Sequence, residues 1–129
     1  MILADFRDYL KTLKVAEHYS IGKINNSQEY SLGVYSMGNL LRRIEAVGLV
    51  SSYDVAGVNL LLHWNKNANE TEAAARNLFE AIRYITDVDM GLTHVEYIDI
   101  QGSEPNFIGT DQNGVYEYTI HMNIYYRRR

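Results

Sequence analysis

The segment over residues 115–126 has the most regular pattern in the chain, an alternation of two kinds of side chain. One side of it carries apolar and aromatic residues: Tyr116, Tyr118, Ile120, Met122, Ile124 and Tyr126. The other side carries mainly polar residues: Glu117, Thr119, His121 and Asn123, together with Tyr125. A period of two is that of a β-strand, whose successive side chains point to opposite faces of its sheet. The chain is therefore predicted to form a sheet with one face covered by other elements.

A second strand with two different faces is predicted over residues 55–64. Its apolar side is formed by Val58, Leu60, Leu62 and Trp64, and its other side by Asn59, Leu61 and His63. This pattern is typical of a central strand in a sheet that is covered mainly on one side. Trp64 ends the apolar side, so we interpret it as a core residue rather than as a platform for a ligand.

Two segments have the spacing of amphipathic helices. Residues 2–14 place apolar side chains at steps of three and four, with acids near the start and lysines near the end. A second helix is predicted after Asn69, because Asn69 and Glu72 have the spacing of a capping box. The apolar stripe of this second helix is formed by Ala75, Leu78, Phe79, Ile82 and Ile85.

Three further strands are predicted, over residues 18–24, 31–37 and 92–101. The first two could pair as a hairpin or run beside separate neighbours. The third should pair antiparallel with residues 115–126, because a long turn-rich segment joins the two. In that segment, residues 102–114, we expect a loop that contains the single proline of the chain, Pro105.

Residues 38–52 have a less regular pattern. Gly38 and Gly48 bracket apolar residues with helical spacing: Leu40, Leu41, Ile44 and Val47. We interpret the segment as a loop with one short helix. The complete order of elements predicts a single α+β domain over residues 1–129, with a mostly antiparallel sheet of four to five strands and two main helices packed on one face.

Composition excludes several classes of protein. The net charge of −4 argues against a nucleic-acid-binding protein, and the one basic run, Arg127–Arg129, is either a solvated tail or a small contact with an acidic partner. The absence of cysteine excludes disulfides, zinc–thiolate sites and thiol nucleophiles. Neither a signal peptide nor an apolar run of about 18 residues occurs, so a cytosolic protein without a membrane span is expected.

The search for a reactive site leads us to expect no catalytic, cofactor-binding or metal-binding residues. No Gly-x-Ser-x-Gly or glycine-rich phosphate-binding motif is present. The acidic segments 87–91 and 111–114 lack the ligand set of a calcium-binding EF-hand loop. Two or three of the histidines could meet across neighbouring strands and bind a metal. Histidines scattered over a sheet face are the more common explanation for such residues, which are His18, His63, His94 and His121.

Several segments, in matching order along most of the chain, resemble small phage proteins often labelled minor capsid proteins. The strand Val55–Asn67 matches V-x-G-V-x-x-L-x-H-W-N-K-N, and a helix that starts with E-T-E follows it at Glu70–Glu72. The other matching pieces are Tyr19–Ile24 (Y-x-I-G-K), Ser31–Tyr35 (x-x-G-V-Y), Gly109–Tyr118 (G-T-D-x-N-G-x-Y-E) and Ile124–Tyr126 (I-Y-Y).

The resemblance implies a siphophage tail terminator, also called a tail-to-head joining protein. Such a protein forms a hexameric ring on the finished tail tube and presents a surface to the head-completion protein. It would assemble in the cytoplasm of the bacterial host and remain in the virion at the head–tail junction. The family has no catalytic residues, so a non-enzymatic structural protein is expected, without cofactors, membrane contact or sequence-specific contact with nucleic acid.

A ring of identical subunits needs a head-to-tail interface that closes on itself. We expect this interface in the 38–52 segment, the 102–114 segment and the polar side of the last strand, including His121, Asn123 and Tyr125. Two other functions remain open from the sequence. One is a head-completion or stopper protein of the same particle, and the other is a small ligand-binding or hydrolytic α+β domain unrelated to phage.

Overall fold

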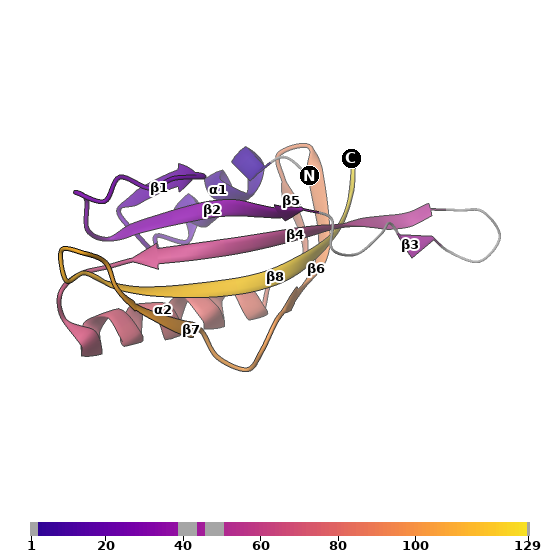
Figure 1. The fold of residues 1–129 in the computed structure, drawn as a ribbon. Helices are drawn as coiled ribbons and strands as arrows, with labels where there is room; N and C mark the ends of the chain where they lie inside the picture. Colours follow the sequence, from indigo (N-terminus) through magenta and orange to yellow (C-terminus); the bar gives the residue numbers. More distant parts are fainter. Residues whose placement is uncertain (1–2, 39–43, 46–50, 129) are drawn as a thin grey trace.

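The computed structural model describes residues 3–38, 44–45 and 51–128 of the chain. These residues form two helices and eight strands (Figure 1). The helices are α1 (Leu3–Thr12) and α2 (Ala68–Arg83). The strands are β1 (His18–Ile21), β2 (Ser31–Gly38), β3 (Ile44–Glu45), β4 (Ser51–His63), β5 (Thr86–Met90), β6 (Thr93–Ile100), β7 (Asn106–Thr110) and β8 (Tyr116–Arg128). The predicted α+β class is confirmed.

The strands form one sheet in the order β1-β2-β4-β8-β6-β5, with β3 beside β4 and β7 beside β8. The predicted count of four to five strands is wrong, because β3, β5 and β7 lie in segments expected to be loops or turns. Strand β4 is central, and β6 pairs antiparallel with β8, as predicted. The other described pairs are also antiparallel except β1 with β2, so the sheet is mixed rather than purely antiparallel.

The parallel pairing of β1 with β2 replaces the hairpin that was one of the two expectations for these strands. The segment between the two strands crosses back, so that β2 starts beside the start of β1. In this segment the amide of Gly22 donates a hydrogen bond of 2.8 Å to the carbonyl of Val34. Ile24 in this segment is buried against Gly33, where an added Cβ would come within 2.7 Å of Ile24 Cγ2. Glycine at position 33 therefore leaves the space that the crossing segment occupies.

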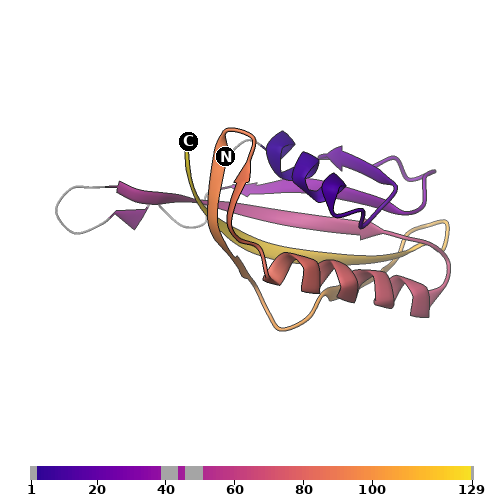
Figure 2. The same ribbon diagram turned by 180° about the vertical axis from the view of Figure 1, so that it is seen from behind.

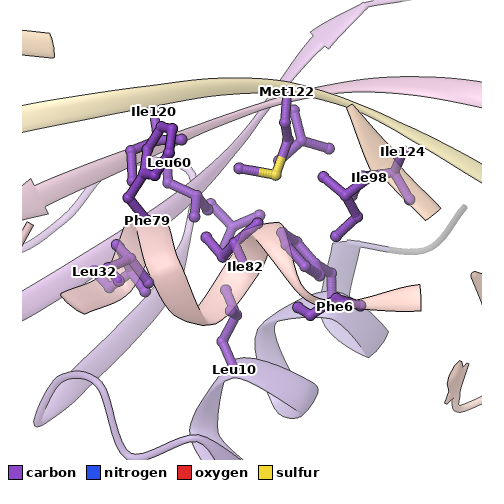
Figure 3. Packing of buried hydrophobic residues seen from close by; sticks show 14 of the residues in the cluster. Phe6, Leu10, Leu32, Leu60, Phe79, Ile82, Ile98, Ile120, Met122 and Ile124 are labelled. Atoms are coloured by element: carbon purple, nitrogen blue, oxygen red, sulfur yellow. The ribbon is translucent and has the colours of Figure 1, made fainter. Parts of the chain in front are cut away.

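Both helices lie on the same side of the sheet, as the view from behind shows (Figure 2). The face they cover carries the apolar residues of the alternating strands, among them Leu60 and Met122. Phe6 and Leu10 of α1 and Ile82 of α2 enter the same cluster, so one core joins both helices to the sheet (Figure 3). Trp64 packs against the edge of this core, in agreement with its predicted role.

Helix α2 begins two residues earlier than the capping-box spacing predicts. The N-cap is Asn67, which has an extended backbone and accepts a hydrogen bond of 3.0 Å from the amide of Glu70. Asn65 supports this cap, because its side-chain oxygen accepts from the Asn67 amide at 2.9 Å. The polar segment after β4 is therefore a cap built from side-chain amides rather than a loop before the cap.

The two predicted loops contain strands. Residues 106–110 form β7, which pairs with the first residues of β8. Residues 44–45 and 51–52 belong to β3 and β4, which pair with each other, instead of forming a short helix. The other residues on which that helix was predicted, Leu40, Leu41 and Val47, lie outside the described residues. In both segments pairing with a long neighbouring strand outweighs local turn preference.

Helix α1 also contacts the tight turn between β5 and β6. Asp5 accepts a hydrogen bond of 3.3 Å from the amide of Leu92, next to Gly91. Gly91 has a φ of +60°, and a Cβ added there would overlap the Asp5 carboxylate. The turn therefore needs glycine both for its backbone and for its contact with α1.

Replacing Gly91 by alanine tests this contact. We expect Gly91→Ala to lower the free energy of unfolding by about 2–3 kcal/mol, because it combines backbone strain with displacement of Asp5. The matched control is Gly114→Ala, where φ is +84° but a Cβ would meet nothing within 4 Å. The control should cost about 1–2 kcal/mol. Urea denaturation measures both, and equal losses would show that the Asp5 contact contributes nothing.

Candidate functional site

The side of the sheet opposite the helices carries most of the polar residues singled out from the sequence. We call it the polar face. Its central part is formed by Asn59 and His63 of β4 and by Glu117, Thr119, His121, Asn123 and Tyr125 of β8. The register places Asn59 beside His121 and His63 beside Glu117. The fold thus brings together three of the four histidine-bearing strands, β4, β8 and β6, although each histidine lies in a different row.

The polar face is less exposed than the sequence suggests. Asn123 is only 9% exposed and Tyr125 only 8%, whereas His121 is half-buried. The ring of Tyr125 stacks on that of Tyr97 with centroids 4.4 Å apart, which covers this part of the face. Of the three residues expected at an interface, His121 alone offers substantial surface. The expectation of exposure is wrong for Asn123 and Tyr125, and the stacked ring of Tyr97 on β6 explains the burial of Tyr125.

A buried cluster occupies the end of the polar face where β4 ends. His63 is 0% exposed, and its Nδ1 lies 2.8 Å from Oε2 of Glu117. Its Nε2 lies 3.7 Å from Oδ2 of Asp111, in the turn before β8. Both Nε2 and that Asp111 oxygen are buried without a hydrogen bond in the described part of the chain. His63 is therefore held between two carboxylates, one on its neighbouring strand and one on the following turn.

Asp111 also organises the turn itself. Its Oδ1 accepts hydrogen bonds from the amides of Asn113 at 2.8 Å and Val115 at 3.0 Å. Burial alone would raise the pKa of Asp111, but these backbone hydrogen bonds and the nearby His63 together lower the pKa below its usual value. The carboxylate is thus ionised and fixed, and it ties the turn to the end of β4.

This cluster has part of the layout of a hydrolytic triad but not its nucleophile. Ser31 lies opposite His63 in the register of β2 and β4. However, the Ser31 hydroxyl donates a hydrogen bond of 2.9 Å to the carbonyl of Gln28, and His63 Nε2 faces Asp111 instead. A histidine activates a serine only when its free nitrogen accepts from the hydroxyl. The geometry is that of a structural ion-pair network.

A second cluster lies on the β5–β6 hairpin. The ring of His94 lies between two carboxylates, with Nδ1 2.7 Å from Oδ1 of Asp89 and Nε2 2.8 Å from Oδ1 of Asp87. Glu96 lies close by and pairs with Arg127 of β8 at 2.9 Å. His94 pairs with Arg127 in the register, which places the cluster at the edge of the polar face. The hydrogen bond to Asp89 raises the pKa of His94; partial burial opposes this effect, and Asp87 adds to it.

Sequence reasoning missed the grouping of these residues. From the sequence, Asp87 and Asp89 are considered as calcium ligands and rejected, and His94 is grouped with the other three histidines rather than with these carboxylates. The signal that could have found the cluster is the Asp-x-Asp pattern followed by Gly91, which predicts a hairpin that places Asp89 opposite His94 and Asp87 two residues away along the same strand. Among the described residues, the metal-compatible group contains one histidine, not the two or three considered from the sequence.

A shallow hollow of about 330 Å³ lies between α2, β6 and the segment after β6. Its walls combine apolar side chains, from Phe79, Ile98 and Ile100, with polar surface to which Arg83 and Ser103 contribute. Ligand sites usually combine an apolar wall with several converging polar groups. The hollow is one location for the ligand-binding alternative, but the polar side chains among its lining residues are limited to Arg83 and Ser103.

Strand β7 presents the most exposed apolar side chains among the described residues of the predicted interface segments. Phe107 is 57% exposed and Ile108 is 53% exposed. The Phe107 ring contacts Tyr118 of β8 at a centroid distance of 5.2 Å. Within the described residues, β7 pairs with β8 alone, so its other edge has no strand beside it.

Comparison with known proteins finds neither a matching family model nor a matching curated protein. Within the described residues, neither helix is long and apolar enough to cross a membrane.

The His63 network generates a test of stability. We expect His63→Leu to lower the free energy of unfolding by about 3 kcal/mol, because Glu117 and Asp111 lose their shared partner in a buried site. The control His18→Leu, at an exposed position of β1, should change it by less than about 0.5 kcal/mol. The double variant His63→Leu with Glu117→Gln should recover part of the lost free energy of unfolding, measured by urea denaturation. An additive double variant would contradict the network.

The raised pKa of His94 predicts a pH dependence of stability. Because the folded-state pKa lies above the unfolded value of 6.5, the stabilising contribution is complete below that value and is lost as pH rises through the folded-state pKa. The melting temperature of the wild type should therefore exceed that of His94→Gln most at about pH 5–6 and least at about pH 9. A difference that stays constant over this range would show that His94 does not titrate in this way.

Proposed function

We propose that the chain is a non-enzymatic structural protein of a tailed phage, a tail terminator that forms a ring on the tail tube and joins tail to head. Its partners are further copies of itself, most simply in a hexameric ring, the tail tube protein and the head-completion protein. It acts in the host cytoplasm during assembly and then at the head–tail junction of the virion. The resemblance of the sequence to minor capsid proteins motivates this proposal.

The structural observation that carries the proposal is that, within the described residues, the outer edges of β1 and β7 have no strand beside them. Strand β1 ends one side of the sheet, and β7 lies at the other side, next to β8. Exposed apolar side chains accompany both edges, with Ile21 on β1 and Phe107 and Ile108 on β7. A closed ring requires two different complementary surfaces on each subunit, placed apart. Two distinct edges of one sheet supply such a pair of surfaces.

The β7 edge has features that favour association and features that restrict which strands can pair with it. Its exposed apolar residues favour association, but the strand is short and its register with β8 shifts between Phe107 and Gly109. Such bulges and short lengths limit indiscriminate pairing of edge strands. This combination suits a strand that pairs with one defined neighbour during assembly.

The beginning of β4, together with β3, projects beyond the remaining strands of the sheet (Figure 1). Residues of a projecting hairpin can reach a neighbouring subunit without rearrangement of the core. This location agrees with the expectation that the 38–52 segment takes part in an interface. The segments that carry the resemblance include β4 with the α2 cap and the turn into β8. The resemblance on which the proposal rests therefore involves central strands of the sheet.

The alternative within the same particle is a head-completion or stopper protein. The same exposed edges would serve that role, since it also requires a ring. Only the stage at which assembly fails distinguishes the two functions. A ligand-binding or hydrolytic domain receives less support, because the hollow beside α2 offers one charged group and His63 lacks a nucleophile.

The proposal is tested by electron microscopy of lysates from a phage that lacks this gene. Filled heads beside free tails of excessive length are expected, because nothing stops tube growth. Tails of normal length beside emptied heads would instead indicate the head-completion role, and intact particles would contradict both roles.

Complementation of that phage tests the β7 edge. Phe107→Asp should reduce the yield of joined particles by about tenfold or more, because a charge in an apolar contact costs at least about 1.4 kcal/mol. The matched control is Leu92→Asp, since Leu92 is also an exposed apolar residue, 67% exposed, but lies in the β5–β6 turn. Equal yields from both variants would exclude β7 from the interface.

A further inference from the structure

The cluster on the β5–β6 hairpin brings together three side chains that can bind a metal ion. Asp87 comes from β5, and His94 and Glu96 come from β6. One ligand atom of each lies within 4.8 Å of the others. Asp87 is exposed while His94 and Glu96 are half-buried, so the group is open to solvent on one side. An ion could enter from that side without any movement of the backbone.

We propose that Asp87, His94 and Glu96 form a binding site for one divalent transition-metal ion of the Zn²⁺ type. The ligands would be a carboxylate oxygen of Asp87, Nε2 of His94 and a carboxylate oxygen of Glu96, with water completing the coordination. This inference does not depend on the proposed role in phage assembly.

Asp89 supplies the support that a metal-binding histidine usually has. Its carboxylate lies 2.7 Å from Nδ1 of His94, so Nδ1–H donates to Asp89 and the ring is held in one orientation. Nε2 lies within hydrogen-bond distance of Asp87, so it carries a proton in this arrangement, and an ion would bind there by displacing that proton. Histidines that bind metals commonly donate their second N–H to a carboxylate in this way. Asp89 is therefore a positioning residue for the ion rather than a ligand.

The distances require side-chain adjustment in both directions, because ligand atoms up to 4.8 Å apart must also close to about 3.4 Å, with Glu96 turning from Arg127 toward the ion. Zinc binds nitrogen and oxygen at about 2.0–2.2 Å, which separates neighbouring ligand atoms of a tetrahedral site by about 3.4 Å. Nε2 of His94 and Oδ1 of Asp87 are 2.8 Å apart and must therefore move apart by about half an ångström. The Asp87 side chain is 79% exposed and can move by this amount.

Local charge favours a dication. The carboxylates of Asp87, Asp89 and Glu96 surround His94, and Arg127 beside Glu96 is the nearby cation. With a neutral imidazole these side chains carry a net charge of about −2. An imidazole ligand favours zinc and other late transition ions over Ca²⁺ and Mg²⁺, which prefer all-oxygen sites. Arg127 opposes the ion, because it shares Glu96 and adds positive charge.

Isothermal titration of zinc chloride into the chelator-treated full-length protein tests the site. We expect saturable binding of one equivalent, weakened about tenfold or more in both His94→Gln and Asp87→Asn. Asp89→Asn should weaken binding by about tenfold through loss of ring orientation. Arg127→Gln should bind zinc more tightly than the wild type, an effect that a purely structural role of Arg127 would not produce.

The matched control is His18→Gln, which removes an exposed histidine of β1 and should leave binding unchanged. Absence of one-equivalent binding, or equal binding by His94→Gln and the wild type, would overturn the proposal. Should His94→Gln fail to fold, nitrogen-15 NMR of the wild-type histidine rings gives an independent answer. Zinc should then shift Nε2 of His94, whereas a shift confined to other histidines would also overturn the proposal.

Discussion

The pairing of β4 with β8 is the constraint on which the other parts of the fold depend. Ten residues of each strand, from Asp54 to His63 and from Glu117 to Tyr126, lie opposite one another in one continuous register. The register places Leu60 beside Ile120 on the helix side. A slip by one residue would turn every apolar side chain of the moved strand to the polar face. The core, the helices and both polar clusters therefore depend on this single alignment.

The sequence predicts those parts of the fold in which a single strand or helix shows, by the spacing of its own apolar and polar residues, which side is buried. Residues 115–126 alternate over their whole length, and the stripe of the second helix is complete, so both elements and the covered face follow from local pattern. Strands β5 and β7 do not have such a pattern. They form by pairing with the longer strands β6 and β8, which local spacing does not predict. A parallel β1–β2 pair likewise depends on Gly33 and Ile24, whose contact no spacing rule reveals.

The candidate sites also combine features that local pattern predicts with features that depend on neighbouring strands. The polar side of β8 could be assigned to a face from alternation, but the shielding of Tyr125 by Tyr97 depends on a neighbouring strand and its bulge. The two histidine clusters combine residues from different strands or turns, so no single segment contains either. Both clusters are tied to the ends of strands, one on the last turn before β8 and one on the β5–β6 hairpin. These clusters connect the polar face to the turn before β8 and to the β5–β6 hairpin, while within the described residues the outer edges of β1 and β7 have no strand beside them.

The long-range nature of the β4–β8 pairing also affects how the chain folds as it is synthesised. His63 and Glu117 are 54 positions apart in the sequence. At roughly 5–20 residues per second, a ribosome needs about 3–10 s to make the part of the chain between them. During that interval β4 can pair with β2, but its other edge and much of its apolar side remain uncovered. Because such non-local pairing is slow to form, the chain is most vulnerable to aggregation just before its last strand is complete.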